Sequence, residues 1–455
     1  QIKTPVRFDE IPLSSLNAYS TKFSPTDNNN NTFLLQPSFQ SHEPHPLALL
    51  GNYIFSCLVT DPDTMTLKEA LQQDDRSEFL QAMSKELHDH ISRHHWKVVP
   101  RRSVPPHKTC IPMVWSMKRK RNPVGEIIKW KARLCAGGHR SVEFVDYWDT
   151  YSPVVSWQTI RLIFTLAIVN DWHIHSIDFV LAFPQANIKT DIYMRPPHVP
   201  PDFIIPDLPT YYDKVSKVYK LIKNLYGLKD AGRTWNDHLT SGLIKRGWQQ
   251  STIDECLFTK KGAIFILYVD DACIISPSKP LIKSEIISLQ SDYDLTDGGE
   301  LQDYLGTRFD RSSDDSVTLA QPRMINRVLE IVGLNKNENV KVHDTPATII
   351  LTDTVAAKLR LQKWNYRSAN GCLSYIQAMV RPDITFATQQ CARFCNNPGR
   401  DHEEAIKRIC RYLLKTKSQG LTLRPDKSKG LECFVDADWA GSWTQASSHD
   451  PLSTH

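Results

Sequence analysis

The spacing of apolar residues predicts an α+β fold built from more than one domain. Between residues 107 and 345, strand-like runs such as Val114–Arg119 and Ile264–Val269 alternate with helical runs such as Trp157–Val169. From Trp364 to Leu421 the pattern becomes helical, and one further strand is expected at residues 431–435. A chain of 455 residues, 41% of them apolar, is long enough to bury two or three cores.

The N-terminal part differs from this alternation. Residues 1–60 lack periodicity and contain four consecutive asparagines, so we expect a disordered linker. Residues 61–106 are expected to form a helical lead-in, because Thr66 and Glu69 fit a capping box and a helical period continues, with or without an interruption, to about His95. The chain begins at Gln1 rather than Met, which predicts a fragment or a processed product.

Histidine and cysteine occur in patterns that could suggest a metal. The lead-in helix has four histidines that no carboxylate-flanked set of partner ligands accompanies, so a solvated helix face is favoured over a metal site: His88, His90, His94 and His95. The ten cysteines show no C-x2-C spacing. Cys391 and Cys395 lie four apart in a helical stretch, and we interpret them as reduced thiols.

Charge and hydropathy limit the class of partner. A net charge of +5 suits a polyanion partner without requiring one. The most apolar helical stretch, Ile160–Val169, contains Arg161 and is too short to span a bilayer. With no secretory signal at its start, the sequence predicts no membrane partner.

The strongest chemical signal lies in Ala263–Ile275, where two apolar strands flank Asp270 and Asp271. Tight hairpin turns favour Asn-Gly or Asp-Gly because both central residues need a positive φ, so Asp-Asp is a poor turn. Adjacent carboxylates beside apolar strands are costly unless something neutralises them. An exposed acidic turn and a site for a divalent cation are the two interpretations.

A third carboxylate, Asp178, lies in Ile177–Phe183, which is otherwise apolar and is interpreted as a strand. If this strand pairs with the Asp270–Asp271 segment, three carboxylates converge. Oxygen ligands in that number suit Mg²⁺, which binds through a few carboxylates together with substrate phosphates. Two such ions, about 3.5–4 Å apart, would activate an attacking 3′-hydroxyl and stabilise a leaving pyrophosphate.

The segment Met117–Arg133 is predicted to be a basic β-hairpin whose turn is Asn-Pro-Val-Gly at residues 122–125. Alternation places the cations of the returning strand on one face. Such a field suits a triphosphate or a nucleic-acid backbone, while a solvated basic edge strand or an import signal is the alternative. Seven cations accompany a single acid, Glu126: Lys118, Arg119, Lys120, Arg121, Lys129, Lys131 and Arg133.

These segments together resemble the copia-type (Ty1/copia) retrotransposon reverse transcriptases, over roughly residues 66–445. Lys131-Ala132-Arg133-Leu134 resembles a signature of that family, and Asp178 and Tyr268-Val269-Asp270-Asp271 follow in the family's order. The other matching blocks are Leu225–Trp235, Asp294–Leu301 with Tyr304–Gly306, and Arg381–Ala387.

The resemblance implies a right-hand polymerase with fingers, palm and thumb in residues 107–345. A helical connection or tether at 346–430 and a truncated RNase H-like start at 431–455 would follow. Asp178, Asp270 and Asp271 would be the catalytic metal ligands, and Asp436 the first RNase H ligand. Nucleotide-binding residues would be Lys131 and Arg133 at the triphosphate, Phe183 against a ribose 2′-hydroxyl, and Tyr226 with Gly227 in the pocket.

The implied function is that of an RNA-directed DNA polymerase from the pol polyprotein of an LTR retrotransposon. It would add dNTPs to a primer 3′ end on an RNA or DNA template, using two Mg²⁺ ions, with Mn²⁺ as an alternative. The resemblance implies localisation in cytoplasmic virus-like particles, with the nucleus as a second compartment. It does not indicate an oligomeric state.

The chain departs from the family pattern at two places. Asp230-Ala231-Gly232 stands where the family has Gln-Ala-Pro, and Pro184-Gln185 where it has Asn-Gly. An inactive or domesticated copy that binds nucleic acid without polymerising is therefore the alternative function. A nuclease is disfavoured because most of its active-site residues are missing.

Overall fold

The computed structural model describes residues 63–121, 126–201, 203, 216–312, 316–334, 341–347, 351, 364–426 and 428. The chain divides into two compact units, residues 1–24 with 426–455, and residues 25–425. All the described helices and strands belong to the second unit. The expected linker at 1–60, the turn at 122–125, the strand at 431–435 and Asp436 lie outside the described residues.

The lead-in is helical as predicted in the middle of its range, but strands lie at both ends, with β2 (Trp96–Pro100) at the C-terminal end. A short strand, β1 (Thr64–Thr66), is followed by α2 (Leu67–Ala70) and α3 (Arg76–Ser92). The predicted capping box is confirmed, because the backbone N–H of Thr66 donates to Glu69 Oε2 at 2.7 Å and the N–H of Glu69 donates to Thr66 Oγ1 at 3.3 Å. The helical stretch is interrupted between α2 and α3.

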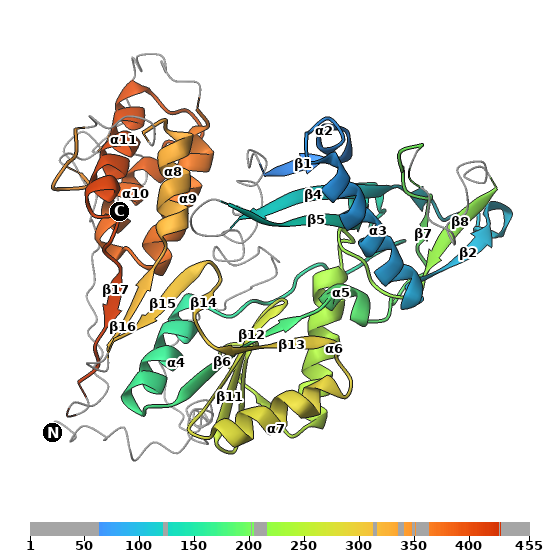
Figure 1. The fold of residues 1–455 in the computed structure, drawn as a ribbon, viewed down its shortest axis with the longest axis horizontal. Coiled ribbons are helices and arrows are strands. Elements are labelled where there is room, and N and C mark those ends of the chain that lie inside the picture. The colour runs from blue at the N-terminus through green and yellow to red at the C-terminus, as the bar shows by residue number, and fades with distance from the viewer. Residues whose placement is uncertain are drawn as a thin grey trace, which may run out of the picture. The chain divides into compact units, whose positions relative to one another are not determined.

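The predicted basic hairpin is also present. Its strands, β4 (Met113–Arg121) and β5 (Ile127–Ala136), pair antiparallel in a three-stranded sheet of order β1-β4-β5. Helix α3 covers one face of this hairpin (Figure 1). Burial of apolar side chains from both elements holds them together: Phe79, Met83 and Leu87 from α3, and Met117, Ala132 and Leu134 from the strands.

A six-stranded sheet of order β13-β6-β12-β11-β10-β9 follows. Nearly all side chains of β11 and β12 are buried, which is why these strands read as continuous apolar runs. Its strands are β6 (His173–Phe179), β9 (Gln249–Gln250), β10 (Leu257–Lys260), β11 (Ala263–Tyr268), β12 (Asp271–Ser276) and β13 (Leu295–Glu300).

Three predicted helices accompany this sheet: α4 (Trp157–Val169), α6 (Ala231–Lys245) and α7 (Lys279–Gln290). The bounds of α4 match the prediction. Helix α7 begins before the predicted Ser284, because Ser278 accepts a hydrogen bond from the N–H of Leu281 and Pro280 occupies the first turn.

Two four-stranded sheets complete the strand content of the described residues, in the orders β2-β8-β7-β3 and β14-β15-β16-β17. The first consists of β2 (Trp96–Pro100), β3 (Cys110–Ile111), β7 (Tyr193–Met194) and β8 (Lys217–Leu221). The second consists of β14 (Asp303–Tyr304), β15 (Thr307–Arg311), β16 (Val317–Ala320) and β17 (Leu421–Leu423).

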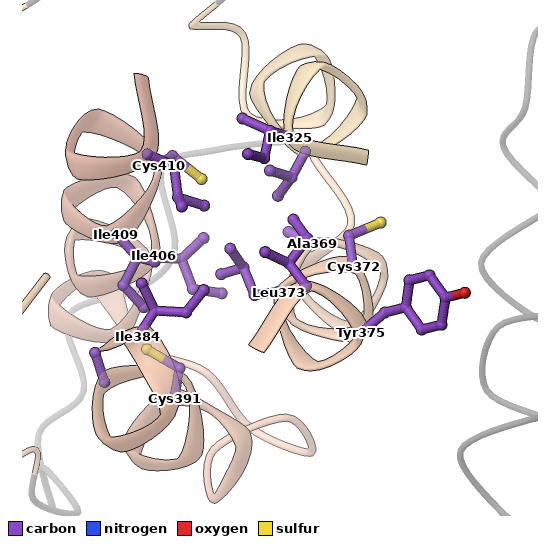
Figure 2. Packing of buried hydrophobic residues seen from close by; sticks show 14 of the residues in the cluster. Ile325, Ala369, Cys372, Leu373, Tyr375, Ile384, Cys391, Ile406, Ile409 and Cys410 are labelled. Atoms are coloured by element: carbon purple, nitrogen blue, oxygen red, sulfur yellow. The ribbon is translucent and has the colours of Figure 1, made fainter. Parts of the chain in front are cut away.

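The C-terminal helices form their own apolar core, as the helical pattern predicts (Figure 2). Cys391 and Cys410 lie inside it among isoleucines and leucines, which makes both of them packing residues. The helices are α8 (Pro322–Ile331), α9 (Tyr366–Met379), α10 (Thr385–Ala392) and α11 (Arg400–Lys415).

The solvated-face interpretation of the histidines is wrong for two of the four. His88 and His94 are exposed, but His90 and His95 are buried. Their Nδ1 atoms lie 2.7 Å apart, and the ring of His90 stacks on that of Trp96 at 5.1 Å. Packing against Trp96 of β2 thus buries the C-terminal end of α3. Among the described helices, none has the length and apolarity needed to cross a membrane.

Candidate active site

The three predicted carboxylates come together at one end of the six-stranded sheet. Strands β6 and β12 pair antiparallel, and Asp178 lies directly opposite Asp271. Residues opposite each other in such a pair project from the same face of the sheet. Asp270 immediately precedes Asp271 at the turn between β11 and β12. The predicted pairing of the two segments is confirmed.

The turn itself differs from the expectation. Its two central residues are Val269 and Asp270, because Tyr268 pairs with Asp271, which already belongs to β12. Val269 has a φ of 59°, an unfavourable value for a β-branched residue. Two hydrogen bonds restrain this turn: Phe179 N–H donates to Asp270 O at 3.3 Å, and Trp235 Nε1 donates to Val269 O at 2.7 Å.

The carboxylates repel one another. Loss of surrounding water, together with the negative charges of Asp270 and Asp178, raises the pKa of Asp271 to about 6. Burial and the charge of Asp178 also raise the pKa of Asp270, and the cations of Arg133 and Lys131 oppose this shift. Three acidic groups therefore gather at a point that two basic residues approach.

The segment after Asp178 is a turn and a short helix, where a continuous strand was expected. Strand β6 ends at Phe179, and Leu181 adopts a φ of 49° before α5 (Ala182–Gln185) begins. Phe183 therefore lies on a helix. The Gln185 side chain donates to the carbonyls of Val180 at 2.7 Å and of Asp294 at 2.8 Å.

Gln185 also accepts a hydrogen bond from the N–H of Asp294 at 2.9 Å. Its amide thereby links the turn after Asp178 to the residue that precedes β13. The sequence identified Gln185 only as a departure from the family pattern; the structure assigns it a local structural role.

Three of the predicted nucleotide-binding residues form a contact chain, and Gly227 adjoins it in sequence. The rings of Phe183 and Tyr226 lie 4.8 Å apart, and the guanidinium of Arg133 lies 4.3 Å from the centroid of the Tyr226 ring. Gly227 follows with a φ of 89°, and a Cβ there would lie 2.2 Å from the carbonyl oxygen of Ala136 at the end of β5. Glycine is required for this close approach.

The cations on the two faces of the β4–β5 hairpin differ in whether a carboxylate pairs with them. Arg119 makes two hydrogen bonds, of 2.7 and 2.6 Å, to the carboxylate of Asp75, and Arg121 binds Asp63 at 2.7 Å. The lead-in thus compensates two of the seven cations, so the excess charge predicted from the local sequence was too large. The compensated arginines alternate along β4 with Lys118 and Lys120.

On the other face, Lys118 lies opposite Lys131, and Lys120 lies opposite Lys129. Like charges directly opposite in an antiparallel pair are destabilising. Burial, Arg133 and Lys120 lower the pKa of Lys131, while Asp178 acts in the other direction. The charge of Lys120 reaches Asp271, whose pKa it lowers. This basic face lies near the carboxylates.

The donor set at the carboxylates fits a divalent cation in its chemistry. Carboxylate oxygens are the ligands that Mg²⁺ prefers, and a cation would relieve the repulsion that helps to raise the pKa values of Asp270 and Asp271. Among the described residues, however, no three His, Cys, Asp or Glu side chains are already disposed to hold a metal ion together. The residues are suited to a metal, but they are not arranged around one.

Trp235 is the functional candidate that sequence reasoning missed. It belongs to the matching block Leu225–Trp235, but nothing in the local sequence indicated its contact with Val269, which lies 34 positions further along the chain. The indole Nε1 of Trp235 needs a hydrogen-bond acceptor when it is buried, and this was the only sequence feature that could have indicated the contact.

Comparison with known proteins identifies the family. A sequence profile of "Reverse transcriptase (RNA-dependent DNA polymerase)" matches residues 93–346, more than half of the 455 residues. The chain belongs to this family, and its resemblance to copia-type members is confirmed by the curated relatives.

Two such relatives are plant transposon proteins. The chain is 32% identical over 389 residues to the retrovirus-related Pol polyprotein from transposon RE1 of Arabidopsis thaliana, covering 84% of this chain and 25% of the polyprotein. It is 31% identical over 394 residues to that from transposon TNT 1-94 of Nicotiana tabacum, covering 84% and 28%. The chain therefore spans about a quarter of the length of these relatives.

Among solved structures, a foamy viral protease-reverse transcriptase in complex with double-stranded DNA is similar at 11% identity and a TM-score of 0.36. The similarity covers 72% of this chain and 47% of that one. The family assignment rests on the sequence matches.

Proposed function

We propose that this chain is the polymerising part of a retrotransposon pol polyprotein, an RNA-directed DNA polymerase that extends a primer with dNTPs. The observation that carries the proposal is the pairing of β6 with β12, which sets Asp178 opposite Asp271 and beside Asp270. The raised pKa values of Asp270 and Asp271 support the proposal, because burial and the neighbouring carboxylates outweigh the nearby cations. Such a cluster is suited to metal-assisted phosphoryl transfer.

The parts of a right-hand polymerase can be matched to the fold. The β4–β5 hairpin would be the fingers, and the six-stranded sheet with α6 and α7 the palm. The thumb would complete residues 107–345, and the helical core of α8 to α11 would belong largely to the connection at 346–430. The carboxylates would then lie on the palm, and the lysines of the basic hairpin on the fingers.

In this function Asp178, Asp270 and Asp271 would hold the metal. Mg²⁺, expected as a pair of ions and replaceable by Mn²⁺, would supply activation of the primer 3′-hydroxyl and stabilisation of the leaving pyrophosphate. Lys131 and Arg133 would bind the triphosphate, because their cations already approach Asp270. The stacking of Arg133 on Tyr226 orients its guanidinium for that contact.

Phe183 would select the sugar. Its ring is held against Tyr226 and its helix follows the turn that begins after Asp178, so its position is constrained on both sides. A rigid aromatic ring beside the nucleotide would exclude a ribose 2′-hydroxyl by steric overlap. Tyr226 and Gly227 would form the adjoining wall of the pocket.

The alternative, an inactive copy that only binds nucleic acid, is not favoured. The departures at Asp230–Gly232 and Pro184–Gln185 leave all three carboxylates in place, and Gln185 supports the segment that follows Asp178. The RNA or DNA template and primer, the dNTPs, and residence in cytoplasmic particles or the nucleus remain part of the proposal.

The test is primer extension on an RNA template, with Mg²⁺ and without it, comparing wild type with Asp270→Asn. The matched control is Asp171→Asn, because Asp171 lies just before the other end of β6 and its φ of 53° suits asparagine. A metal ligand is worth several kcal/mol, so Asp270→Asn should lower extension at least about 100-fold, with primer–template binding kept. Extension by Asp270→Asn at the control's rate would refute the assignment.

A further inference from the structure

The indole of Trp235 lies between the two segments that carry the carboxylates. Trp235 is 0% exposed, and its Nε1 donates to the carbonyl oxygen of Val269 at 2.7 Å. Its ring also meets that of Phe179 edge to face, with centroids 5.2 Å apart. Val269 immediately precedes Asp270, and Phe179 immediately follows Asp178.

Trp235 is itself held rigidly. Its ring lies 6.1 Å from that of Tyr293, which in turn lies 5.9 Å from Phe179. The Tyr293 hydroxyl donates to the carbonyl of His238 in the same helix, α6, at 3.2 Å. A three-ring cluster therefore fixes the direction of the indole N–H from α6 toward the turn.

The turn needs such a restraint. Val269 has a φ of 59°, which a β-branched residue adopts only where its surroundings enforce it. Its carbonyl accepts the indole N–H in a part-buried hydrogen bond, and loss of the N–H would leave this acceptor without its protein donor. The bond fixes the Val269–Asp270 peptide, which sets the direction in which the Asp270 side chain leaves the turn.

We infer that Trp235 is a positioning residue for the metal-binding carboxylates. This inference rests on the proposed function. The indole N–H makes its bond to protein backbone, so it acts through the orientation of Asp270 relative to Asp178. Loss of the N–H would let the turn relax and would weaken divalent-cation binding and the chemical step, while dNTP and template binding would be retained.

Trp248 provides a matched control. It is 2% exposed, and its Nε1 also donates a hydrogen bond, to Glu285 Oε2 at 3.2 Å. Glu285 lies on α7 and is not part of the carboxylate turn. Trp235→Phe and Trp248→Phe therefore remove the same atoms from equally buried positions, and only the first removes a bond to the turn.

The experiment measures Mn²⁺ binding by electron paramagnetic resonance, together with kcat and KM for dNTP and the thermal unfolding of each variant. Both variants should lose similar stability. Trp235→Phe should weaken Mn²⁺ binding and lower kcat, each about tenfold, with KM for dNTP unchanged. Trp248→Phe should change neither Mn²⁺ binding nor kcat by more than about twofold.

Should Trp235→Phe fail to fold, benzothienylalanine at position 235 replaces the N–H by sulfur in a ring of the same shape, and the same changes are expected. Unaltered Mn²⁺ binding and kcat in the folded variant, or a change confined to KM, would overturn the inference. The wild type and Asp270→Asn report separately on the proposed function: if they behave as expected while Trp235→Phe does not, only the positioning role fails.

Discussion

The β4–β5 hairpin and the β11–β12 hairpin each gather charges of one sign, but the protein compensates them differently. On β4, Arg119 and Arg121 are neutralised by Asp75 and Asp63 from the lead-in. At the β11–β12 turn, Asp270 and Asp271 have no such internal partner among the described residues, and their pKa values are raised.

The comparison extends to the other face of the basic hairpin. In the described structure, Lys120, Lys129 and Lys131 form no ion pair with a carboxylate, although Lys129 and Lys131 each face another lysine across the strands. Charges that the fold compensates stabilise the fold. Charges left uncompensated at a cost to stability indicate where an oppositely charged ligand belongs. Replacing the charged groups of each class, or changing their protonation, tests the distinction.

The largest effect is expected from the uncompensated cations. Lys131→Ala combined with Arg133→Ala should lower kcat/KM for dNTP about 100-fold, chiefly through KM, because each charge-assisted contact to the triphosphate is worth about 1.5–3 kcal/mol. Steady-state single-nucleotide incorporation measures it. Lys220→Ala, which removes a cation paired with Asp191, is the control and should have little effect. Weaker duplex binding with a flatter salt slope, at unchanged KM, would instead assign the hairpin to the template backbone.

The compensated cation should behave in the opposite way. Arg119→Ala should lower the free energy of unfolding by about 2–3 kcal/mol, because the Arg119 and Asp75 side chains are only 13% and 16% exposed and Asp75 would lose its partner. The kinetic constants of the folded enzyme should not change. Denaturant unfolding measures the loss, and Arg308→Ala, at an exposed pair with Asp310, is the control.

The same pair predicts an acid dependence. The hydrogen bonds from Arg119 lower the pKa of Asp75 to about 2. Its contribution to stability is therefore present above the unfolded value of about 4 and is lost as the pH falls toward 2. Arg119→Ala should flatten this part of the stability profile; an unchanged profile would mean that the pair contributes nothing.

A smaller effect is expected on the selection between deoxyribose and ribose, for which Phe183 is the proposed residue. Phe183→Val should lower the preference for deoxynucleotides over ribonucleotides about tenfold or more, because a smaller side chain leaves room for the 2′-hydroxyl. Incorporation of both sugars at one template position measures the ratio, with the constants for dNTP as the internal control. An unchanged ratio would exclude Phe183 as the selecting residue.

The smallest effect concerns the repulsion among the carboxylates themselves. The pKa of Asp271 is raised to about 6, so in metal-free protein the folded state loses stability as the pH rises from about 4 through 6. Asp271→Asn should remove this loss and stabilise the metal-free protein by roughly 1 kcal/mol at pH 8, a value reduced for solvent screening. Unfolding between pH 5 and 8 measures it, and a destabilised variant would contradict the proposed repulsion.

The sequence by itself determined many of the elements and pointed to the candidate site residues. Apolar runs placed β11 and β12, a helical period placed α4 with matching bounds, and alternation assigned Lys131 and Arg133 to one face. These features depend on residues a few positions apart, whose spacing the backbone geometry fixes. The carboxylates were recognisable because charges within apolar strands are costly.

The tertiary structure decided which of these groups are compensated and what supports them. Asp75 partners Arg119 across the lead-in, His90 and His95 meet in a core, and Trp235 bonds to Val269. Such contacts join segments whose separation in the chain carries no periodic signal, and they form only when apolar burial brings the segments together. Short sequence segments thus indicate which chemical groups the candidate site contains, whereas the geometry of these groups depends on packing between distant parts of the chain.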